Sequence, residues 1–365
     1  MAAPRSHQVT ILDGKRLEPI HRFASRGELI GAAQFTPDGR HALFASREGW
    51  ITKFDLRSLK SVAEVRAGLV TSVIALSADG QFVAVANREP HTLVVLDAGL
   101  QPLKVLDARD LAKQRSAAVS SVVDVAPRRS FAAALGDLKE LWEVSYDPGA
   151  AEIADGLVHD YKLREGAFVP GFLNPRRTPL EDRIDDLLAL PDGSRLIGTA
   201  RDGGPGQVIH LDVRRRIATL DLPGRPNAAA AIHWQRDGRT VLGIPNLRDG
   251  LVSVIDVRDW TTLGQIGTPG PVQFLRSHAG SRYAFADSLP SGEHPGTVQV
   301  IDKQRLEIVA QLRPVPGKTP AWAGFERSGH YVLISVAQAE RGLIVYDAST
   351  LKEVKRLSIG EPVRK

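Results

Sequence analysis

The densest group of potential metal ligands is the segment Glu181-Asp-Arg-Ile-Asp-Asp186, which carries four carboxylates within six residues. Carboxylate oxygens bind hard cations such as Ca²⁺ and Mg²⁺, so a cation site is one interpretation of this segment. The other interpretation is a charged approach to the apolar strand expected at Leu187–Leu190, and we favour it. No Ser-His-Asp triad can be assembled from the sequence, because such triads are recognised by their geometry. Catalytic residues and a metal site therefore stay unassigned.

The chain contains no cysteine. This excludes disulfides, thiolate-bound zinc, iron–sulfur clusters and a Cys-x-x-Cys-His haem attachment within it, and it leaves the redox compartment open. No glycine-rich loop follows a strand and opens a helix, so we expect no nucleotide site.

The net charge is +5 and the isoelectric point is near 9.5, but the basic residues are scattered. The densest basic run, Arg214 to Arg216, has no interleaved aromatic residues, so we expect a solvated turn and no nucleic-acid binding. The longest apolar run falls short of the ~20 residues that a membrane helix needs. Met1 to Gln8 lacks the apolar stretch of a secretory leader, so either the protein stays where it is made or a leader was removed before this numbering begins.

A recurring Asp-Gly turn between two β-type runs predicts the elements that position these side chains. Asp-Gly between alternating apolar segments is the strongest short-range signal of a β-hairpin. The four clear copies are Thr36-Pro-Asp-Gly-Arg40, Ser77-Ala-Asp-Gly-Gln81, Leu190-Pro-Asp-Gly-Ser194 and Gln235-Arg-Asp-Gly-Arg239, and weaker copies include His278-Ala-Gly-Ser281 and Arg327-Ser-Gly-His330.

A second motif, an apolar or β-branched run that ends in Asp, follows each hairpin. We expect this Asp to accept hydrogen bonds from backbone amides of the tight turn that it opens. The copies are Val9-Thr-Ile-Leu-Asp13, Ile51-Thr-Lys-Phe-Asp55, Leu93-Val-Val-Leu-Asp97, Val208-Ile-His-Leu-Asp212, Val252-Ser-Val-Ile-Asp256, Val298-Gln-Val-Ile-Asp302 and Leu343-Ile-Val-Tyr-Asp347.

Together the two motifs form a four-stranded unit of about 40–50 residues, which is the period of a propeller blade. Gln8–Phe23 supplies only the second half of a further unit, and we expect it to lie in a closing blade. The sequence therefore predicts one domain over residues 1–365, an all-β, eight-bladed β-propeller with four-stranded antiparallel blades and an incomplete closing blade. The seven complete units begin near Gly31, Thr71, Ser120, Arg183, Asn227, Val272 and Ala321.

Asp147–Pro179 is longer than the other connections expected between blades and is rich in Gly, Pro and Arg. It is either a surface excursion or a loop over the mouth of the ring, where propellers bind ligands. The sequence leaves both interpretations open.

Blocks spread over nearly the whole chain resemble the d₁-haem propeller domain of the cytochrome cd₁ nitrite reductase family. The resemblance is densest to the subgroup of NirN-type dihydro-haem d₁ dehydrogenases. The blocks include Glu18-Pro-Ile-His-Arg-Phe23, Phe44-Ala-Ser-Arg-Glu-Gly-Trp50, Gly156-Leu-Val-His-Asp-Tyr161, Pro245-Asn-Leu-Arg-Asp-Gly250 and Arg276-Ser-His278.

The resemblance implies a haem d₁ over the central channel, with a proximal histidine, distal histidines and arginines that pair with its carboxylates. This sequence departs from that pattern at several of the positions concerned. Histidines implied by the resemblance are replaced by Ile30, Asn227, Asn246 and Trp322, and arginines by Ser72 and Ala118. We therefore expect haem d₁ binding that is weakened or lost.

The residues that remain as candidates for cofactor binding are Arg47, His159, Arg201, Asn227, Asn246 and His278. Each of the two arginines and two histidines also has a structural interpretation, because Arg47 and Arg201 follow strands and the histidines neighbour turns.

Two functions follow from the resemblance. The first is a tetrapyrrole-binding protein of nitrite reduction or of haem d₁ maturation, in the periplasm and with a c-type cytochrome or a maturation partner. The second is a propeller scaffold or interaction module, natural or engineered, without catalysis. Function resides in the site and not in the fold, so the fold alone does not decide between them.

Overall fold

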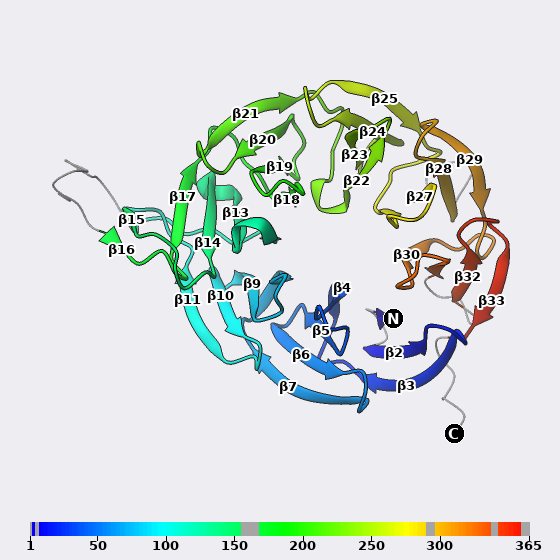
Figure 1. Cartoon of the computed structure of the whole chain (residues 1–365), viewed down its shortest axis with the longest axis horizontal. Helices are drawn as coiled ribbons and strands as arrows, with labels where there is room; N and C mark the ends of the chain where they lie inside the picture. The colour runs from blue at the N-terminus through cyan, green and yellow to red at the C-terminus, as the bar shows by residue number, and fades with distance from the viewer. Residues whose placement is uncertain (1, 4–6, 155–167, 290–295, 337–341, 359–365) are drawn as a thin grey trace. The chain divides into compact units, whose positions relative to one another are not determined.

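The computed structural model describes residues 2–3, 7–154, 168–289, 296–336 and 342–358. Within these residues, four consecutive strands of a repeat pair in antiparallel order, and this blade occurs seven times. Figure 1 shows the order within a blade, for example β4, β5, β6 and β7 side by side. The fold class is an all-β, seven-bladed propeller.

The first four blades are β4 (Leu29–Phe35), β5 (His41–Ser46), β6 (Trp50–Asp55), β7 (Lys60–Arg66); β8 (Val70–Leu76), β9 (Phe82–Glu89), β10 (Thr92–Asp97), β11 (Pro102–Asp107); β12 (Ser121–Val125), β13 (Ser130–Leu135), β14 (Glu140–Ser145), β17 (Pro175–Pro179); and β18 (Asp186–Ala189), β19 (Arg195–Thr199), β20 (Gly206–His210), β21 (Arg215–Leu220). The last three are β22 (Ile232–Arg236), β23 (Arg239–Pro245), β24 (Leu251–Asp256), β25 (Thr262–Gly267); β26 (Leu275–Ser277), β27 (Tyr283–Ser288), β28 (Thr297–Asp302), β29 (Glu307–Leu312); and β30 (Pro320–Phe325), β31 (Tyr331–Val336), β32 (Leu343–Asp347), β33 (Glu353–Leu357). Short 3₁₀ helices are η2 (Ala126–Arg128), η3 (Gly136–Leu138) and η4 (Ala228–Ala230).

The expectation of eight blades is wrong, because the four-stranded unit forms only seven times in the part of the chain that the structure describes. Gln8–Phe23 supplies β2 (Gln8–Asp13) and most of β3 (Glu18–Ala24), and these strands join the two-residue strand β1 (Ala2–Ala3) in a separate three-stranded sheet. The repeat in the sequence shows strand pairs, but it does not show whether a further pair completes them to a blade.

The burial of the strands explains their composition. The middle strands are covered on both faces, so Val83 to Ala86 in β9 are wholly buried and form a continuous apolar run. The fourth strands have one solvated face and alternate, as in β11, where only Leu106 is buried. Neighbouring blades pack on each other through these apolar faces, for example Leu93 of one blade and Trp142 of the next.

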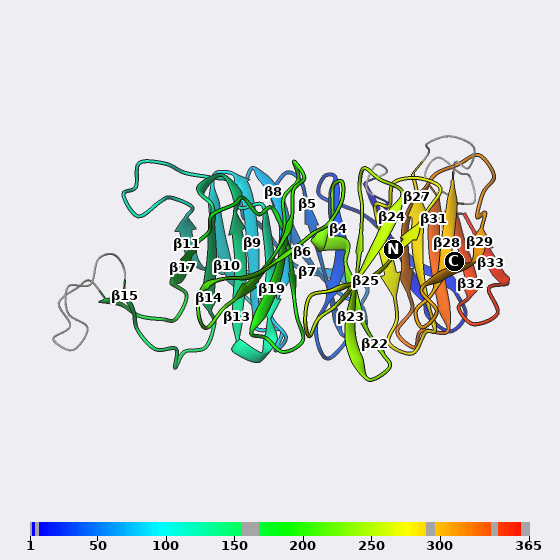
Figure 2. The same cartoon turned by 90° about the horizontal axis from the view of Figure 1, so that it is seen from above.

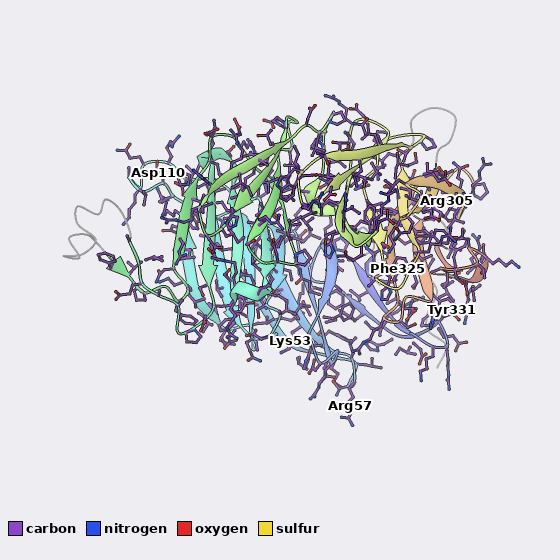
Figure 3. The ribbon with its side chains drawn as sticks, turned by 45° about the horizontal axis from the view of Figure 1, so that its top comes forward. Lys53, Arg57, Asp110, Arg305, Phe325 and Tyr331 are labelled. Atoms are coloured by element: carbon purple, nitrogen blue, oxygen red, sulfur yellow. The ribbon has the colours of Figure 1, made fainter. Side chains whose placement is uncertain are left out.

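The aspartates at the ends of the third strands hold the turns that follow them, as the sequence predicts. Asp55 Oδ1 accepts hydrogen bonds from the backbone N–H groups of Ser58 and Arg57 at 3.0 and 2.8 Å, and Asp302 Oδ1 accepts one from Arg305 at 3.1 Å. Figure 3 labels Arg57 and Arg305 in these turns. The hydrogen bonds, that from Ser58 above all, hold the pKa of Asp55 at about 2.

The long segment Asp147–Pro179, expected between blades, lies within one: it follows the third strand, β14, and its last residues form the fourth strand, β17. The chain leaves β14, forms the short pair β15 (Ile153–Ala154) and β16 (Phe168–Val169), and returns as β17. Figures 1 and 2 show β15 extending away from β13 and β14, beyond β17. The described part of this segment is therefore a surface excursion.

The chain forms two compact units. The first comprises Met1–Val9, Arg22–Gly198 and Gln207–Ile217, and the second comprises Thr10–His21, Thr199–Gly206 and Ala218–Lys365.

Replacing Asp302 by Ala should lower the free energy of unfolding by about 2 kcal/mol, because it leaves the backbone donors of Gln304 and Arg305 and the guanidinium of Arg282 without their buried acceptor. Asp259→Ala is the matched control, because Asp259 accepts its hydrogen bonds from Thr261 in an exposed turn, and its effect should be much smaller. Urea unfolding measures both. Equal losses in the two variants would contradict a special role for the aspartates that end the third strands.

Candidate functional site

A single buried amide shapes the loop Gly224–Ala228, which leads into β22. Asn246, directly after β23, is 1% exposed, and its Nδ2 donates to the Pro223 carbonyl at 2.6 Å. Its Oδ1 accepts from the backbone N–H groups of Arg225, Arg248 and Asp249 at 3.1, 2.9 and 2.8 Å. The amide of Asn246, where the resemblance implies a histidine ligand, thus makes its hydrogen bonds to the protein itself.

Gly224 allows this loop to approach its neighbours closely. Its φ of +65° lies in the left-handed region, and a Cβ atom there would lie 2.1 Å from a carboxylate oxygen of Asp249 and 2.6 Å from Nδ2 of Asn246. Any other residue would be strained and would displace the amide that holds the loop. The loop conformation therefore depends on Gly224 and Asn246 together.

Two polar side chains of this loop have no hydrogen-bond partner among the described residues. Arg225 is half-buried, its Nε is buried without a partner, and no described residue pairs with its guanidinium. Asn227 is half-buried, and its side-chain amide has no hydrogen-bond partner among the described residues. A buried donor left unpaired costs about 1–3 kcal/mol, which an acceptor on a ligand would recover. The loop therefore carries a guanidinium and an amide, the two groups that suit an anionic, oxygen-rich ligand.

The following blade of the same unit has a second unsatisfied polar group. Asp287 is fully buried: its Oδ1 accepts from the backbone N–H groups of Gln273 and Phe274, both at 2.8 Å, and its Oδ2 has no partner. Burial raises the pKa of Asp287 to about 6. Arg276 of β26 acts on Asp287 electrostatically without forming an ion pair, and burial lowers the pKa of Arg276.

In the first unit, the positions where the resemblance implies cofactor ligands hold small or apolar side chains. Ile30 lies in β4 and packs against the core cluster that contains Leu43 and Ile51. Ser72 lies at a register shift in β8, and its buried hydroxyl has no hydrogen-bond partner. Ala118 is half-buried just before β12. None of these three side chains offers an imidazole nitrogen to bind iron or a guanidinium to bind a carboxylate.

Arg47 and Arg201 lie in turns between second and third strands, as expected. Arg47 is 60% exposed in its side chain and forms an ion pair with Glu28 at 3.0 Å, which agrees with its structural interpretation. Arg201 is half-buried in the turn between β19 and β20. Trp322 lies half-buried in β30, where its ring covers Gly324.

The structure does not bring His278 together with the other candidates of its unit. His278 lies in the turn between β26 and β27, whereas Asn227 and Asn246 lie at the opposite end of the blade strands, where second strands end. Its Nδ1 accepts the Gly280 backbone N–H at 3.1 Å, and its ring packs against Phe325, with 5.9 Å between the ring centroids. These contacts agree with the structural interpretation of His278. His159 lies outside the described residues.

Sequence reasoning missed Arg225 and the pair Arg276 and Asp287, although Arg276 stands in one of the blocks that resemble the family. Nothing in the sequence separates Arg225 from arginines that form ion pairs, such as Arg282 with Asp302 at 2.6 Å. The feature that sets Arg225 and Arg276 apart is the missing partner, and this appears only in three dimensions.

The acidic segment 181–186 is neutralised by arginines. Arg216 pairs with Glu181 and with Asp182, the latter at 2.6 Å, and Arg183 pairs with Asp185 at 2.8 Å. These ion pairs support the interpretation of the segment as a charged approach to β18. Among the described residues, no group of three or more His, Asp or Glu side chains is arranged to hold a metal ion.

A cavity of about 340 Å³ lies below the excursion in the first unit, between Arg128, Glu143, Asn174 and Arg176. Arg128 is already bound by Glu143 at 2.6 Å and by Asp212 at 2.5 Å. The cavity contains none of the candidate residues from the sequence.

No helix in the described part of the chain has the length and apolarity to span a bilayer.

Replacing Asn246 by Ala should lower the free energy of unfolding by about 2–4 kcal/mol, because three backbone donors lose their acceptor. Asn227→Ala removes the same amide from the same loop, but it breaks no hydrogen bond among the described residues. It should leave the stability nearly unchanged. Urea denaturation compares the two variants, and a larger loss for Asn227→Ala would contradict the assignment of Asn246 as the residue that holds the loop.

Replacing Asp287 by Asn should flatten the pH dependence of stability. The native pKa of about 6 exceeds the ordinary 3.8, so the folded state holds this proton more tightly than the unfolded chain. Stability should therefore fall as pH rises from about 4 to about 6, by on the order of 3 kcal/mol from this group. Thermal unfolding across this range measures the difference between the two proteins, and identical slopes would contradict the assignment.

Comparison with known proteins agrees with the resemblance seen in the sequence. Residues 3–365 match the family described as cytochrome D1 heme domain. The dihydro-heme d1 dehydrogenase of Pseudomonas aeruginosa PAO1 is 44% identical over 357 residues, which cover 98% of this chain and 68% of that protein. Protein NirF of Stutzerimonas stutzeri is 28% identical over 363 residues, which cover 96% of this chain and 86% of that protein.

A similar solved structure is that of the dihydro-heme d1 dehydrogenase NirN in complex with DHE. It superimposes with a TM-score of 0.86 at 45% sequence identity and covers 96% of this chain and 71% of that one. The resemblance inferred from the repeated blocks is confirmed, and this chain belongs to the cytochrome D1 heme domain family.

Proposed function

We propose that this chain binds a d₁-type tetrapyrrole in the course of haem d₁ maturation, and that the loop Gly224–Ala228 holds a carboxylate of the macrocycle. The observation that carries the proposal is the half-buried guanidinium of Arg225, which has no partner among the described residues. Guanidinium binds carboxylate in a bidentate, charge-assisted geometry. The similarity to a dihydro-heme d1 dehydrogenase over 98% of the chain supports the choice of ligand.

The residues present fit the carboxylates of such a ligand better than they fit its iron. Arg225 offers a cation, and Asn227 offers an amide in the same loop. Ile30, at the position implied for the proximal histidine, packs in the apolar core and cannot ligate a metal. We therefore expect a tetrapyrrole held mainly through its side groups, and more weakly than one fixed by imidazole.

When bound, the tetrapyrrole itself supplies the redox chemistry, and the protein orients it and shields it from water. Dehydrogenation of a saturated side chain releases two electrons and two protons, so a dehydrogenase needs an electron acceptor. This chain has no cysteine to attach a c-type haem. The proposed acceptor is therefore a c-type cytochrome or a maturation partner, and the proposed location is the periplasm.

The alternative function, a propeller scaffold without catalysis, is favoured by one set of observations. Ile30, Ser72 and Ala118 offer neither iron ligation nor charge. The two functions differ in whether Arg225 has a ligand, and direct binding separates them.

Titration of the purified chain with haem d₁, followed by its visible spectrum, tests the proposal. The wild type should bind, and Arg225→Gln should raise the Kd by about tenfold or more, because it removes a charge-assisted contact. Arg258→Gln is the control, since Arg258 is an exposed arginine in the turn after β24, at the opposite end of the same blade. No uptake by the wild type would favour the scaffold function, and equal affinity in all three proteins would refute the role of Arg225.

A further inference from the structure

The cavity of about 340 Å³ in the first unit takes no part in the proposed tetrapyrrole site. One side of it is the edge of a blade, where β14 and β17 lie side by side (Figure 1), and the described start and return of the excursion form the other side. Its size is at the lower end of the roughly 300–1,000 Å³ of ligand pockets. The charged residues that line it are two cations and two anions, Arg128, Arg176, Glu143 and Asp147. The cavity therefore suits a small molecule without net charge.

Arg176 enters this cavity without an ion-pair partner among the described residues. The register of β17 against β14 places it directly opposite Glu143, where opposite charges normally pair across strands. Glu143 is instead held by Arg128 Nε at 2.6 Å and by the Ser130 hydroxyl at 3.0 Å. Arg128 also binds Asp212 at 2.5 Å, a second carboxylate on which Arg176 acts electrostatically. Arg128 thus occupies both carboxylates near Arg176, and the half-buried guanidinium of Arg176 is left for a ligand.

Asp147 brings the opposite charge to the same cavity. Its Oδ1 accepts the Gly149 backbone N–H at 3.0 Å, and its Oδ2 lies 4.0 Å from Nε of Arg129. The side chains of Asp147 and Arg129 are 47% and 49% exposed, so this long contact neutralises little of the charge. Asp147 and Arg176 both line the cavity and are not paired with each other. One cavity therefore offers an unpaired cation and a carboxylate that can accept further hydrogen bonds.

The wall formed by the excursion is fixed by contacts of its own. A Cβ atom at Gly171 would lie 2.1 Å from the Ala151 carbonyl oxygen and 2.9 Å from that of Ala150, so only glycine allows the outgoing and returning segments to approach so closely. Asn174 Nδ2 donates to the Pro170 carbonyl at 3.0 Å, within the returning segment. A cavity that is already formed binds its ligand without the cost of ordering a loop.

We propose that this cavity binds a small zwitterion, a free amino acid with a short aliphatic side chain. Its carboxylate meets the guanidinium of Arg176 and its ammonium meets the carboxylate of Asp147, both in charge-assisted hydrogen bonds. Pro127 and Ile153 supply apolar lining for the aliphatic part. A simple anion or a simple cation fits less well, because it would leave one of the two charges without a partner. The site goes beyond the proposed function and does not depend on the loop of Arg225.

Isothermal titration of the full chain with L-valine tests the proposal. The wild type should bind with a Kd of about 1 mM or lower, as a ligand of this size allows. Arg176→Gln should raise the Kd by about tenfold or more. Asp147→Asn keeps an oxygen for the Gly149 N–H and should raise the Kd by about fivefold or more. Arg176→Gln breaks no hydrogen bond among the described residues, so it should leave the melting temperature without ligand unchanged.

Arg177→Gln is the matched control on the same strand. Arg177 pairs with Glu140 at 3.3 Å and lies over the Trp142 ring at 4.7 Å from its centroid. It is not among the residues that line the cavity. This variant should therefore lower the melting temperature and leave the Kd for valine unchanged. The same pattern in Arg176→Gln, a lower melting temperature with an unchanged Kd, would show that Arg176 is structural and would overturn the proposal.

Two analogues of valine test the requirement for both charges. 3-Methylbutanoate lacks the ammonium group and 2-methylpropan-1-amine lacks the carboxylate, and each should bind about tenfold more weakly than valine or not at all. Equal binding of 3-methylbutanoate and valine would reduce the cavity to an anion site and overturn the zwitterion. Absence of valine binding to the wild type up to about 10 mM would also overturn the proposal.

Discussion

The amide of Asn246 is the contact on which the proposed ligand site depends. It joins the loop before β22 to the loop after β23 through one donated and three accepted hydrogen bonds. Without it, three backbone donors would be unsatisfied, and Arg225 would sit on a segment free to take other conformations. The guanidinium of Arg225 is therefore held in position by Asn246, a buried residue whose own side chain is hydrogen-bonded to the protein backbone.

Buried polar side chains near the ends of other second strands make similar hydrogen bonds. Asn87 accepts from Thr71 at 2.7 Å and donates to the Ala67 carbonyl at 2.8 Å, while Thr199 accepts from the Ala228 backbone at 3.0 Å. In each case a buried polar side chain satisfies the backbone of the segment that leads into a first strand. The proposed ligand groups therefore rest on an element of the propeller repeat, and any role of Asn246 toward a ligand stays a prediction.

The sequence predicted the repeat well, because the repeat depends on local chemistry. Each feature acts within a few residues: the Asp-Gly turns, the apolar middle strands and the aspartates that end third strands. The blade starts predicted near Gly31, Thr71 and Ala321 lie within two residues of the first residue of a first strand. The number of blades was wrong because completion of a sheet is a long-range property. The Gln8–Phe23 pair has the local pattern of half a blade, yet its described partner is the two-residue strand β1.

The candidate site was harder to predict for the same physical reason. The departures at Ile30, Ser72 and Ala118 from the pattern that the resemblance implies are visible in the sequence, but what sets Arg225 apart is that its guanidinium has no partner among the described residues. The location of His278 was predictable in principle, because its segment is itself a first hairpin turn and first hairpin turns lie at the opposite end of a blade from Asn246. His278 therefore belongs to a block that resembles the family, although it lies at the opposite end of the strands from Asn246.

A crystal structure of the chain with haem d₁ bound tests the central claim most directly. The account predicts a macrocycle carboxylate within about 3 Å of the Arg225 guanidinium. A macrocycle bound with Arg225 facing solvent, or at the cavity below the excursion, would contradict it.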